Sequence, residues 1–386
     1  MINKANFAKF LFFIIVFIVG FNFSDYYFLS KSAIIQNDYS DSLINVKVIV
    51  AGDAMMHEPQ IVAGFNKETN DYNFDHYFQY ISPLIKQFDL SIVNFETTLG
   101  PPPYSGYPQF CAPDAYALAL KKAGFNFFLT ANNHSVDRGL NGILRTIQIL
   151  DSFNINFTGI FKNKNYRDSL YPAIVNMNGL KIAILNYTYG TNGIKIPEPV
   201  IVNLIDTAII SADLLKLKTI NPDFIIATLH WGNEYEREPN KEQKKLAEFL
   251  FSKGVDIIIG SHPHVIQPIE FFNDDKYKNK LVIWSLGNLI SNQRRQYTDG
   301  GLLASFSLVK NKYTSNTLIC DVRYYPVWVY KTLNPVYYYI LPVSYYGNDS
   351  LKKIMNSTDI NSFEIFIKDT RKHLNQDTLR IKEFIY

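Results

Sequence analysis

The chain has 386 residues, of which 47% are hydrophobic and 19% charged, with a formal net charge of +3. This composition is that of a globular protein with ample material for a core, and it excludes a long disordered chain. The small net charge and the lack of a basic stripe argue against a nucleic-acid partner. Two cysteines, Cys111 and Cys320, are too few for a disulfide framework, and their pairing is left open.

The N-terminus carries the features of an export signal. Lys4 and Lys9 precede Phe10–Phe23, a stretch with a single polar residue. As a helix it would be about 21 Å long, shorter than the roughly 30 Å hydrocarbon core of a membrane. It therefore fits a secretory signal better than a full span, although no A-x-A cleavage site follows. We expect residues 1–24 to be a signal peptide or a membrane anchor, residues 25–45 a linker, and the protein to be exported and extracytoplasmic.

Beyond the linker, short apolar runs alternate with amphipathic segments, as is typical of buried strands and surface helices. The expected strands are Asn45–Ala51, Leu90–Val93, Phe125–Thr130, Ala173–Asn176, Lys181–Asn186, Phe224–Leu229, Asp256–Ile259 and Leu281–Trp284. The expected helices are Phe74–Phe88, Asp114–Ala123, Leu140–Phe153, Ala208–Leu217 and Lys241–Lys253. Pro83 argues against one unbroken helix in the first of these. The alternation predicts an α/β core.

The pattern changes near the C-terminus. From Gly301 to about Val343 it is typical of strands only, and Asn361–Tyr386 reads as a charged amphipathic helix. These strands either extend the sheet or form a small appendage. We expect a main domain over residues 46–308, followed by a β-rich extension with a C-terminal helix over residues 309–386.

Five of the seven histidines lie in four short motifs, each directly after an expected strand. A fifth motif, Asn94-Phe95-Glu96, adds a carboxylate. Such strand ends meet at one edge of an open α/β sheet. Imidazole, carboxylate and amide ligands suit Mn²⁺, Zn²⁺ or Fe²⁺ better than Ca²⁺ or Mg²⁺, and two such ions together activate a water at a phosphoryl or carbonyl centre. The candidate metal ligands are Asp53, His57, Glu96, Asn133, His230, His262 and His264.

Each motif alone has a structural alternative. Asp53 could cap a helix, the pair Asn132-Asn133 could form a turn, and His230 could be a hydrogen-bonded core residue. Their joint occurrence at strand ends favours two divalent metal ions.

His134 directly follows Asn133 in the sequence. If Asn133 binds a metal, His134 points elsewhere and can protonate a leaving group. Asp137, three residues further on, either orients His134 or caps the following helix. The candidate catalytic residues are therefore His134 and Asp137.

Taken in order, these stretches resemble the CapA family, also called the poly-γ-glutamate capsule synthesis (PGA_cap) family, which is related to calcineurin-like metallophosphoesterases. The matching stretches are GDAMMH (52–57), NFETTLG (94–100), YSGYPQFCAPDAYALALKKAGF (104–125), ANNHSVDRGLNGILRTI (131–147), LHWGNEY (229–235), GSHPHVIQP (260–268) and WSLGNLI (284–290). The resemblance implies a metallophosphoesterase-like four-layer α/β/β/α sandwich with the ions at strand ends. The extra C-terminal strands and the terminal helix would be added to it.

The resemblance also implies roles for individual residues. One ion would be surrounded by Asp53, His57, Glu96 and His264, and the other by Glu96, Asn133, His230 and His262, with His134 as the acid. Two features depart from the metallophosphoesterase pattern. Asp53 and His57 are four residues apart instead of two, and Glu96 stands where the bridging residue is usually Asp.

Two loop segments, Tyr104–Phe110 and Trp231–Tyr235, would shape the pocket. Arg294 and Arg295 would either meet an anionic substrate or face solvent.

The resemblance implies an exported protein of capsule, poly-γ-glutamate or cell-surface polymer biosynthesis. A dinuclear metal-dependent hydrolase acting on a phosphoester or a γ-glutamyl amide is the first interpretation. The alternatives are a non-catalytic metal- or polymer-binding subunit of a membrane-bound synthesis and export complex, and a general metallophosphodiesterase. The expected partners are an anionic cell-surface polymer or its fragments, membrane-bound capsule synthesis subunits, and the membrane through the N-terminal segment.

Overall fold

The computed structural model describes residues 42–343, 353–374 and 381–384. The chain separates into two compact units, Met1–Ile44 with Lys310–Asn316, and Asn45–Val309 with Thr317–Tyr386. The predicted export segment Phe10–Phe23 lies outside the described residues. Among the helices that are described, none is long and apolar enough to cross a membrane.

The first sheet is built around strand β1 (Leu43–Ala54) and has the order β18-β17-β16-β1-β4-β5-β6, with β15 paired to β1 and β19 paired to β17. The remaining strands are β4 Leu90–Phe95, β5 Phe127–Leu129, β6 Asn156–Thr158, β15 Asn288–Ile290, β16 Gly300–Asn311, β17 Thr317–Lys331, β18 Tyr338–Pro342 and β19 Ile381–Glu383. Strands β1, β4, β5 and β6 run parallel, so their carboxyl ends meet at one edge.

The second sheet has the order β13-β14-β12-β11-β9-β8. Its strands are β8 Ala173–Met177, β9 Leu180–Thr188, β11 Phe224–His230, β12 Ile257–Ser261, β13 Ile269–Phe272 and β14 Lys280–Ile283. The four central strands are parallel and the outer two antiparallel. Strands β8 and β9 pair as an antiparallel hairpin around the turn Asn178-Gly179. Two small pairs complete the strands, β2 (Phe65–Asn66) with β3 (Asp71–Tyr72), and β7 (Ile160–Phe161) with β10 (Ile201–Val202).

Four of the five helices predicted in the main domain are present, and two short helices, Glu58–Gly64 and Lys164–Leu170, were not predicted. The described helices are α3 Glu58–Gly64, α4 Ser82–Ile85, α5 Asp114–Ala123, α6 Gly139–Ser152, α7 Lys164–Leu170, α8 Thr207–Ile220, α9 Lys241–Ser252 and α11 Ser357–Leu374, with a 3-10 helix η1 at Asp75–Phe78. The single helix expected over Phe74–Phe88 is wrong, since the chain forms η1 and α4 instead. Pro83 occupies the first turn of α4, where its missing N–H costs nothing.

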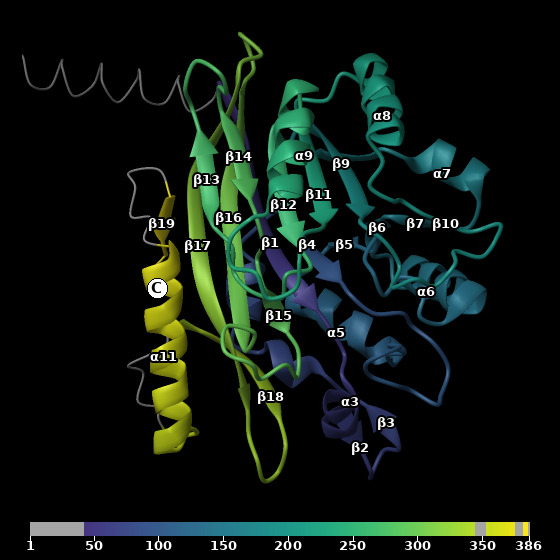
Figure 1. Cartoon of the computed structure of the whole chain (residues 1–386), viewed down its shortest axis with the longest axis vertical. Coiled ribbons are helices and arrows are strands. Elements are labelled where there is room, and N and C mark those ends of the chain that lie inside the picture. Colours follow the sequence, from purple (N-terminus) through teal and green to yellow (C-terminus); the bar gives the residue numbers. More distant parts are fainter. Residues whose placement is uncertain (1–41, 344–352, 375–380, 385–386) are drawn as a thin grey trace, which may run out of the picture. The chain divides into compact units, whose positions relative to one another are not determined.

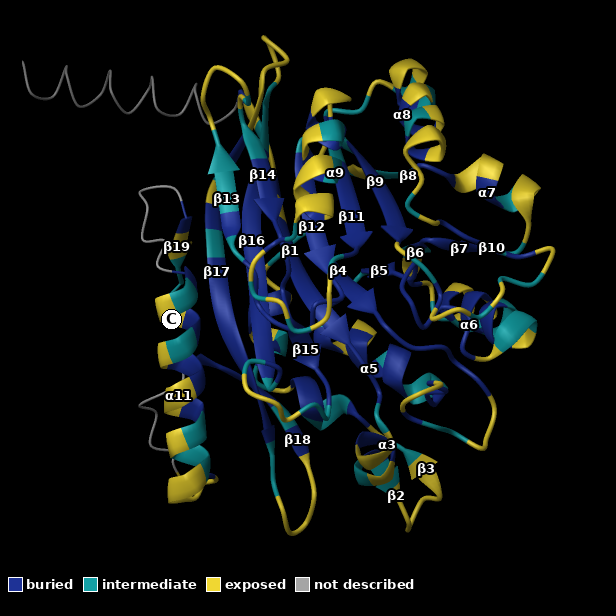
Figure 2. Cartoon of the chain, viewed as in Figure 1, coloured by how far each residue is buried: buried dark blue, intermediate teal, exposed yellow. Residues whose placement is uncertain are grey.

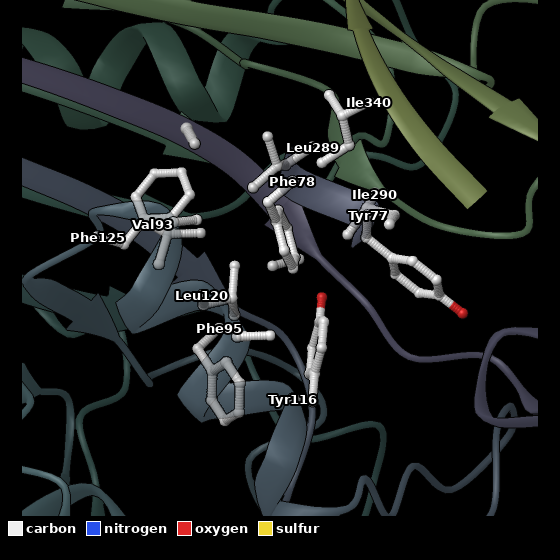
Figure 3. Packing of buried hydrophobic residues seen from close by; sticks show 14 of the residues in the cluster. Tyr77, Phe78, Val93, Phe95, Tyr116, Leu120, Phe125, Leu289, Ile290 and Ile340 are labelled. Carbon is white, nitrogen blue, oxygen red and sulfur yellow. The ribbon is translucent and has the colours of Figure 1, made fainter. Parts of the chain in front are cut away.

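Helices cover the outer face of each sheet. Tyr116 and Leu120 of α5 pack against Val93 and Phe95 of the first sheet (Figure 3). Buried residues of α8 and α9 pack in the same way on the second sheet, opposite Ala227. Each large apolar side chain buried in these layers contributes roughly 1.5–3 kcal/mol.

The two sheets face each other across their inner faces. Ile226 and Thr228 alternate with Ala227 along β11 and point away from the helices, yet they are also buried. Ala131, just after β5, donates its N–H to Asn186 Oδ1 of β9 at 2.8 Å, which joins the sheets directly. Figure 2 shows the strands of both sheets as almost wholly buried. The expected four-layer α/β/β/α arrangement is confirmed.

The C-terminal strands extend the first sheet, which settles the alternative left open by the sequence. Helix α11 runs beside β17 (Figure 1) and buries Phe363, Phe366 and Ile367. The predicted helix over Asn361–Tyr386 is wrong in its second half, because α11 ends at Leu374 and strand β19 later pairs in parallel with Val322–Tyr324 of β17. Cys111 and Cys320 are both free thiols.

Candidate metal centre

Two glycines let the strand ends that carry the candidate ligands come together. A Cβ on Gly52 would lie 1.9 Å from the carbonyl oxygen of Gly287, and one on Gly260 would lie 1.9 Å from that of Trp284. The chain that crosses from β14 to β15 therefore touches the ends of β1 and β12 without room for a side chain. This close approach places Asp53 next to the histidines that follow β12.

Two buried carboxylates lie at the ends of the neighbouring strands β1 and β4. Asn94 Nδ2 donates to Asp53 Oδ1 at 2.8 Å and to Glu96 Oε2 at 3.2 Å. The other oxygen of Glu96, Oε1, is buried and has no hydrogen-bond partner among the described residues. Burial, and then the proximity of Asp53, raises the pKa of Glu96 well above its usual range. Burying a negative charge without a counter-charge costs free energy, so a bound cation would stabilise this pair of carboxylates.

His230 ends strand β11 on the opposite sheet and faces the same carboxylates. Its Nε2 lies 2.9 Å from Asn133 Oδ1 and 3.7 Å from Glu96 Oε1, and its Nδ1 lies 3.0 Å from Ser261 Oγ. Burial, and then the neighbouring His262, lowers the pKa of His230 well below its usual value. The ring is thus neutral at physiological pH, which is the form that binds a metal.

His262 and His264 both adopt left-handed backbone conformations, with φ of 98° and 57°. Such conformations cost energy in residues other than glycine and are concentrated at functional sites. His264 Nδ1 lies 3.0 Å from Asp53 Oδ2 and 3.2 Å from Asn288 Oδ1. His262 Nδ1 is buried without a partner among the residues described, and burial lowers the pKa of His262 to about 3.

Ligand atoms of Asp53, Glu96 and His230 all lie within 4.8 Å of one another, and those of Glu234, His262 and His264 form a second such group. Neutral imidazoles, carboxylates and an amide, two of them with buried unpartnered atoms, match the preferences of borderline divalent cations. The residues therefore fit a site for divalent metal.

Of the predicted carboxylate and imidazole ligands, His57 lies outside both groups. It precedes α3, where its Nδ1 lies 3.3 Å from Gln60 Oε1 and accepts the N–H of Asn292 at 3.3 Å. Its ring meets Phe110 edge-on with centroids 5.2 Å apart. Burial lowers the pKa of His57 to about 4. These contacts give His57 a structural position between α3 and the loop after β15.

His134 and Asp137 form a buried pair next to Asn133. His134 Nδ1 lies 2.7 Å from Asp137 Oδ2, which also accepts the N–H of Phe110 at 2.6 Å. Helix α6 begins after Arg138, so Asp137 does not cap it. Of the two readings of Asp137, the contacts favour the one in which it orients His134.

The sequence analysis did not assign Asn94, Glu234 or Asn288 to the site. Asn94 is two residues before Glu96 on β4, and side chains two apart on a strand share a face, so that spacing was a usable signal. Asn288 lies within the matched stretch WSLGNLI, and Glu234 within LHWGNEY. The sequence predicts a place for Glu234 in the pocket wall, as part of Trp231–Tyr235, but no role as a ligand.

Comparison with known proteins identifies the family. Residues 47–293 match the family model described as bacterial capsule synthesis protein PGA_cap. The chain belongs to this family. The capsule biosynthesis protein CapA of Bacillus anthracis is 29% identical over 286 residues, which cover 71% of this chain and 65% of that protein. The PGA biosynthesis protein CapA of Bacillus subtilis (strain 168) is 27% identical over 292 residues, which cover 71% and 70%. This PGA_cap chain thus aligns with slightly less than two thirds of the anthracis protein.

Two solved structures have a loosely similar fold. The NAD nucleotidase NadN of Haemophilus influenzae has a TM-score of 0.47 at 13% identity and covers 89% of this chain and 58% of that one. The calcineurin-like phosphoesterase YfkN of Bacillus subtilis has a TM-score of 0.43 at 13% identity and covers 86% and 100%. Likeness at this level carries no inference about activity.

Proposed function

We propose that this PGA_cap protein is a dinuclear metal-dependent hydrolase of cell-surface polymer biosynthesis. The observation that carries the proposal is the combination of a buried group of metal ligands with a separate histidine–carboxylate pair beside it. A binding protein needs the first of these features but has no use for the second. A hydrolase needs both, since a leaving group must receive a proton.

The residues divide into two sets with different work. The metal ligands would be Asp53, Glu96, Asn133, His230, His262 and His264, with Glu234 near the second group. Divalent ions bound there would supply an activated water and neutralise charge on the attacked centre. Asn94 holds the two carboxylates in place by donating to both.

His134 would donate the proton to the leaving group. Asp137 engages Nδ1, which leaves Nε2 as the nitrogen that can transfer a proton. The hydrogen bond from Phe110 N to Asp137 fixes the carboxylate in turn. This pair would act only when a substrate brings its leaving oxygen or nitrogen within hydrogen-bond reach of the ring.

The substrate class follows from the relatives rather than from the site. One relative is named for PGA biosynthesis and another for capsule biosynthesis. An anionic polymer, poly-γ-glutamate or its fragments, is therefore the proposed substrate, with a γ-glutamyl amide or a phosphoester as the scissile bond. Export through Phe10–Phe23, retention at the membrane and association with capsule synthesis subunits belong to the same proposal.

The test uses the full chain, stripped of metal and reloaded separately with Mn²⁺, Zn²⁺ or Fe²⁺. We expect two ions per chain by elemental analysis and hydrolysis of either a model phosphodiester or a γ-glutamyl peptide. His134→Ala should lower kcat by about 10²–10⁴-fold with unchanged metal content, because it removes the proton donor and no ligand. His76→Ala is the matched control, since His76 packs against Tyr77 and Tyr337 and is expected to leave kcat unchanged.

Two results would overturn the proposal. A chain that takes up no divalent metal cannot be a metal-dependent hydrolase. A chain that binds metal and polymer, shows no turnover and is indifferent to His134→Ala would instead be the polymer-binding subunit of a synthesis and export complex.

A further inference from the structure

A cavity of about 150 Å³ lies where the loop after β15 meets helix α11. Three arginines, Arg237, Arg294 and Arg295, contribute to its wall, and we call it the arginine pocket. Ile266, two residues beyond His264, lines it as well. The pocket is therefore a neighbour of the metal centre and not part of it.

The three guanidinium groups lack carboxylate partners. Within the described part of the chain, none of them forms an ion pair. Arg237 and Arg294 each donate to a backbone carbonyl, that of Asp369 at 3.3 Å and that of Val329 at 2.7 Å. Arg237 Nε is buried and has no partner among the described residues. Each guanidinium carries five N–H donors, so most of this donor capacity is uncommitted.

Aromatic rings hold two of these guanidinium groups in place. Arg237 Cζ lies 4.0 Å from the centroid of the Tyr297 ring, and Arg295 Cζ lies 4.3 Å from that of Tyr235. Arg237 also hydrogen-bonds to Tyr297 and Arg295 to Tyr235, so each tyrosine fixes its guanidinium while other N–H groups of that guanidinium stay available. Such N–H groups match the two oxygens of a carboxylate or phosphate.

The two acidic residues of the pocket form their hydrogen bonds with side chains other than the three arginines. Asp299 Oδ2 accepts the indole N–H of Trp328 at 2.7 Å, and burial raises the pKa of Asp299. Asp369 Oδ2 accepts from Gln296 at 3.1 Å. Burial also lowers the pKa of Arg237 and of Arg294, which is the direction expected for cations without full compensation. The pocket as a whole carries an excess of positive charge.

Tyr235 connects the arginine pocket to the metal centre. Its ring lies between Arg295 and His264, with centroids of the Tyr235 and His264 rings 6.3 Å apart. Its backbone N–H donates to the carbonyl of Pro263, between the two histidine ligands, at 2.8 Å. A chain-like ligand bound at the metal centre could therefore place a neighbouring group against the guanidinium edges.

We propose that the arginine pocket is a subsite for an oxyanion of the polymer, a carboxylate or a phosphate next to the group held at the metal centre. The identity of that polymer rests on the proposed function. The existence of the subsite does not, because guanidinium groups recognise an oxyanion whether or not a bond is broken nearby.

The test measures binding on the full chain after removal of metal by a chelator, so that hydrolysis cannot contribute. Calorimetry gives the Kd of a defined γ-glutamate oligomer and, separately, of an oligophosphate. Arg295→Gln and Arg237→Gln should each raise the Kd of the preferred oligomer by roughly tenfold, because each removes charge-assisted hydrogen bonds. Arg323→Gln is the control, since Arg323 pairs with Asp321 on β17, outside the arginine pocket, and should leave Kd unchanged.

Each outcome of the binding experiment supports or contradicts the proposed subsite. Weaker binding in both pocket variants, with melting temperatures equal to that of the Arg323 variant, supports the subsite, and the preferred oligomer distinguishes carboxylate from phosphate. Unchanged Kd in both variants overturns it, as does an equal loss in Arg323→Gln. If binding depends on the arginines but the metal-loaded chain hydrolyses nothing, the subsite stands and the hydrolase proposal fails.

Discussion

Two buried polar clusters of this protein differ in whether their hydrogen bonds are complete. In the first, Arg167 of α7 donates from Nε to Asn203 Oδ1 at 2.6 Å and from both terminal nitrogens to Asp213, which also accepts from Tyr187 Oη at 3.0 Å. Neither Arg167 nor Asp213 leaves a buried polar atom without a partner.

The second cluster is the candidate metal centre, where Glu96 Oε1 and His262 Nδ1 have no partner among the described residues. In the first cluster, groups of the protein itself satisfy the buried polar atoms, and we call it the closed network. In the second cluster, buried polar atoms are left that a bound ligand could satisfy, and we call it the open cluster. A fully hydrogen-bonded network stabilises the fold, whereas buried polar atoms without partners cost free energy that a bound ligand can offset.

The largest expected effect comes from breaking the closed network. Asp213→Ala leaves the buried Arg167 guanidinium without its counter-charge and should lower the free energy of unfolding by about 3–5 kcal/mol. Denaturant titration of the metal-free chain measures it. Asp53→Ala is the matched change in the open cluster and should cost less than half as much. Equal losses of unfolding free energy in Asp213→Ala and Asp53→Ala would contradict the proposed difference between the two clusters.

Metal should complete the open cluster only. At a free concentration 100 times Kd, a divalent ion should stabilise the chain by about 3 kcal/mol, seen as a rise in melting temperature that a chelator reverses. Glu96→Gln should abolish this rise in melting temperature. Asp213→Asn should lower the melting temperature of the metal-free chain but leave the rise on adding metal unchanged. A rise that survives Glu96→Gln would mean that the ion binds elsewhere.

The open cluster should also make stability depend on pH. The pKa values of His57, His230 and His262 are lowered in the folded chain, so below about pH 6.5 the unfolded chain binds more protons. Stability of the metal-free protein should therefore fall as pH drops from 6.5 toward 4, by roughly 1 kcal/mol per pH unit for each histidine. The raised pKa values of Glu96, Asp114 and Asp299 oppose this trend, whereas the lowered pKa values of His76 and His373 reinforce it.

Unfolding midpoints measured across that pH range provide the check. His262→Asn should reduce the slope of unfolding free energy against pH by the contribution of one histidine. A profile that rises as pH falls would show that the carboxyls dominate the cluster.

The smallest effect is expected at His57. His57→Ala removes the contacts of its ring with Gln60 and with the N–H of Asn292, and should cost about 1 kcal/mol of stability. Because His57 belongs to neither ligand group, metal content should stay at the wild-type value. Loss of one ion in this variant would restore the role that the resemblance implies for His57.

The sequence predicted the parts of this molecule that depend on local pattern. Strand–helix alternation and polar residues at strand ends are visible one segment at a time, so the α/β core and most of the site residues could be found. Which strand ends face each other is a tertiary property. The resemblance supplied the four layers, and the residues alone did not.

The role of Asn94 depends partly on a tertiary contact: the sequence places it on one face with Glu96, but only the pairing of β4 with β1 brings it to Asp53. His57, four residues after Asp53, lies at the start of α3, and its role as a metal ligand stays a prediction. One prediction is wrong because a tertiary contact overrides local pattern. The helical period of Asn361–Tyr386 continues past Leu374, yet pairing with β17 takes over at Ile381.

The short strand β19 has a consequence for how the protein behaves in concentrated solution. Along one margin of β17, β18 pairs with Val327–Lys331 and β19 pairs with Val322–Tyr324. Without β19, the backbone groups of that second stretch would form an open edge, and such edges recruit strands from other molecules. A chain cut after Leu374 should keep its metal centre but self-associate. By covering this edge, the residues Ile381–Glu383 of β19 would prevent aggregation.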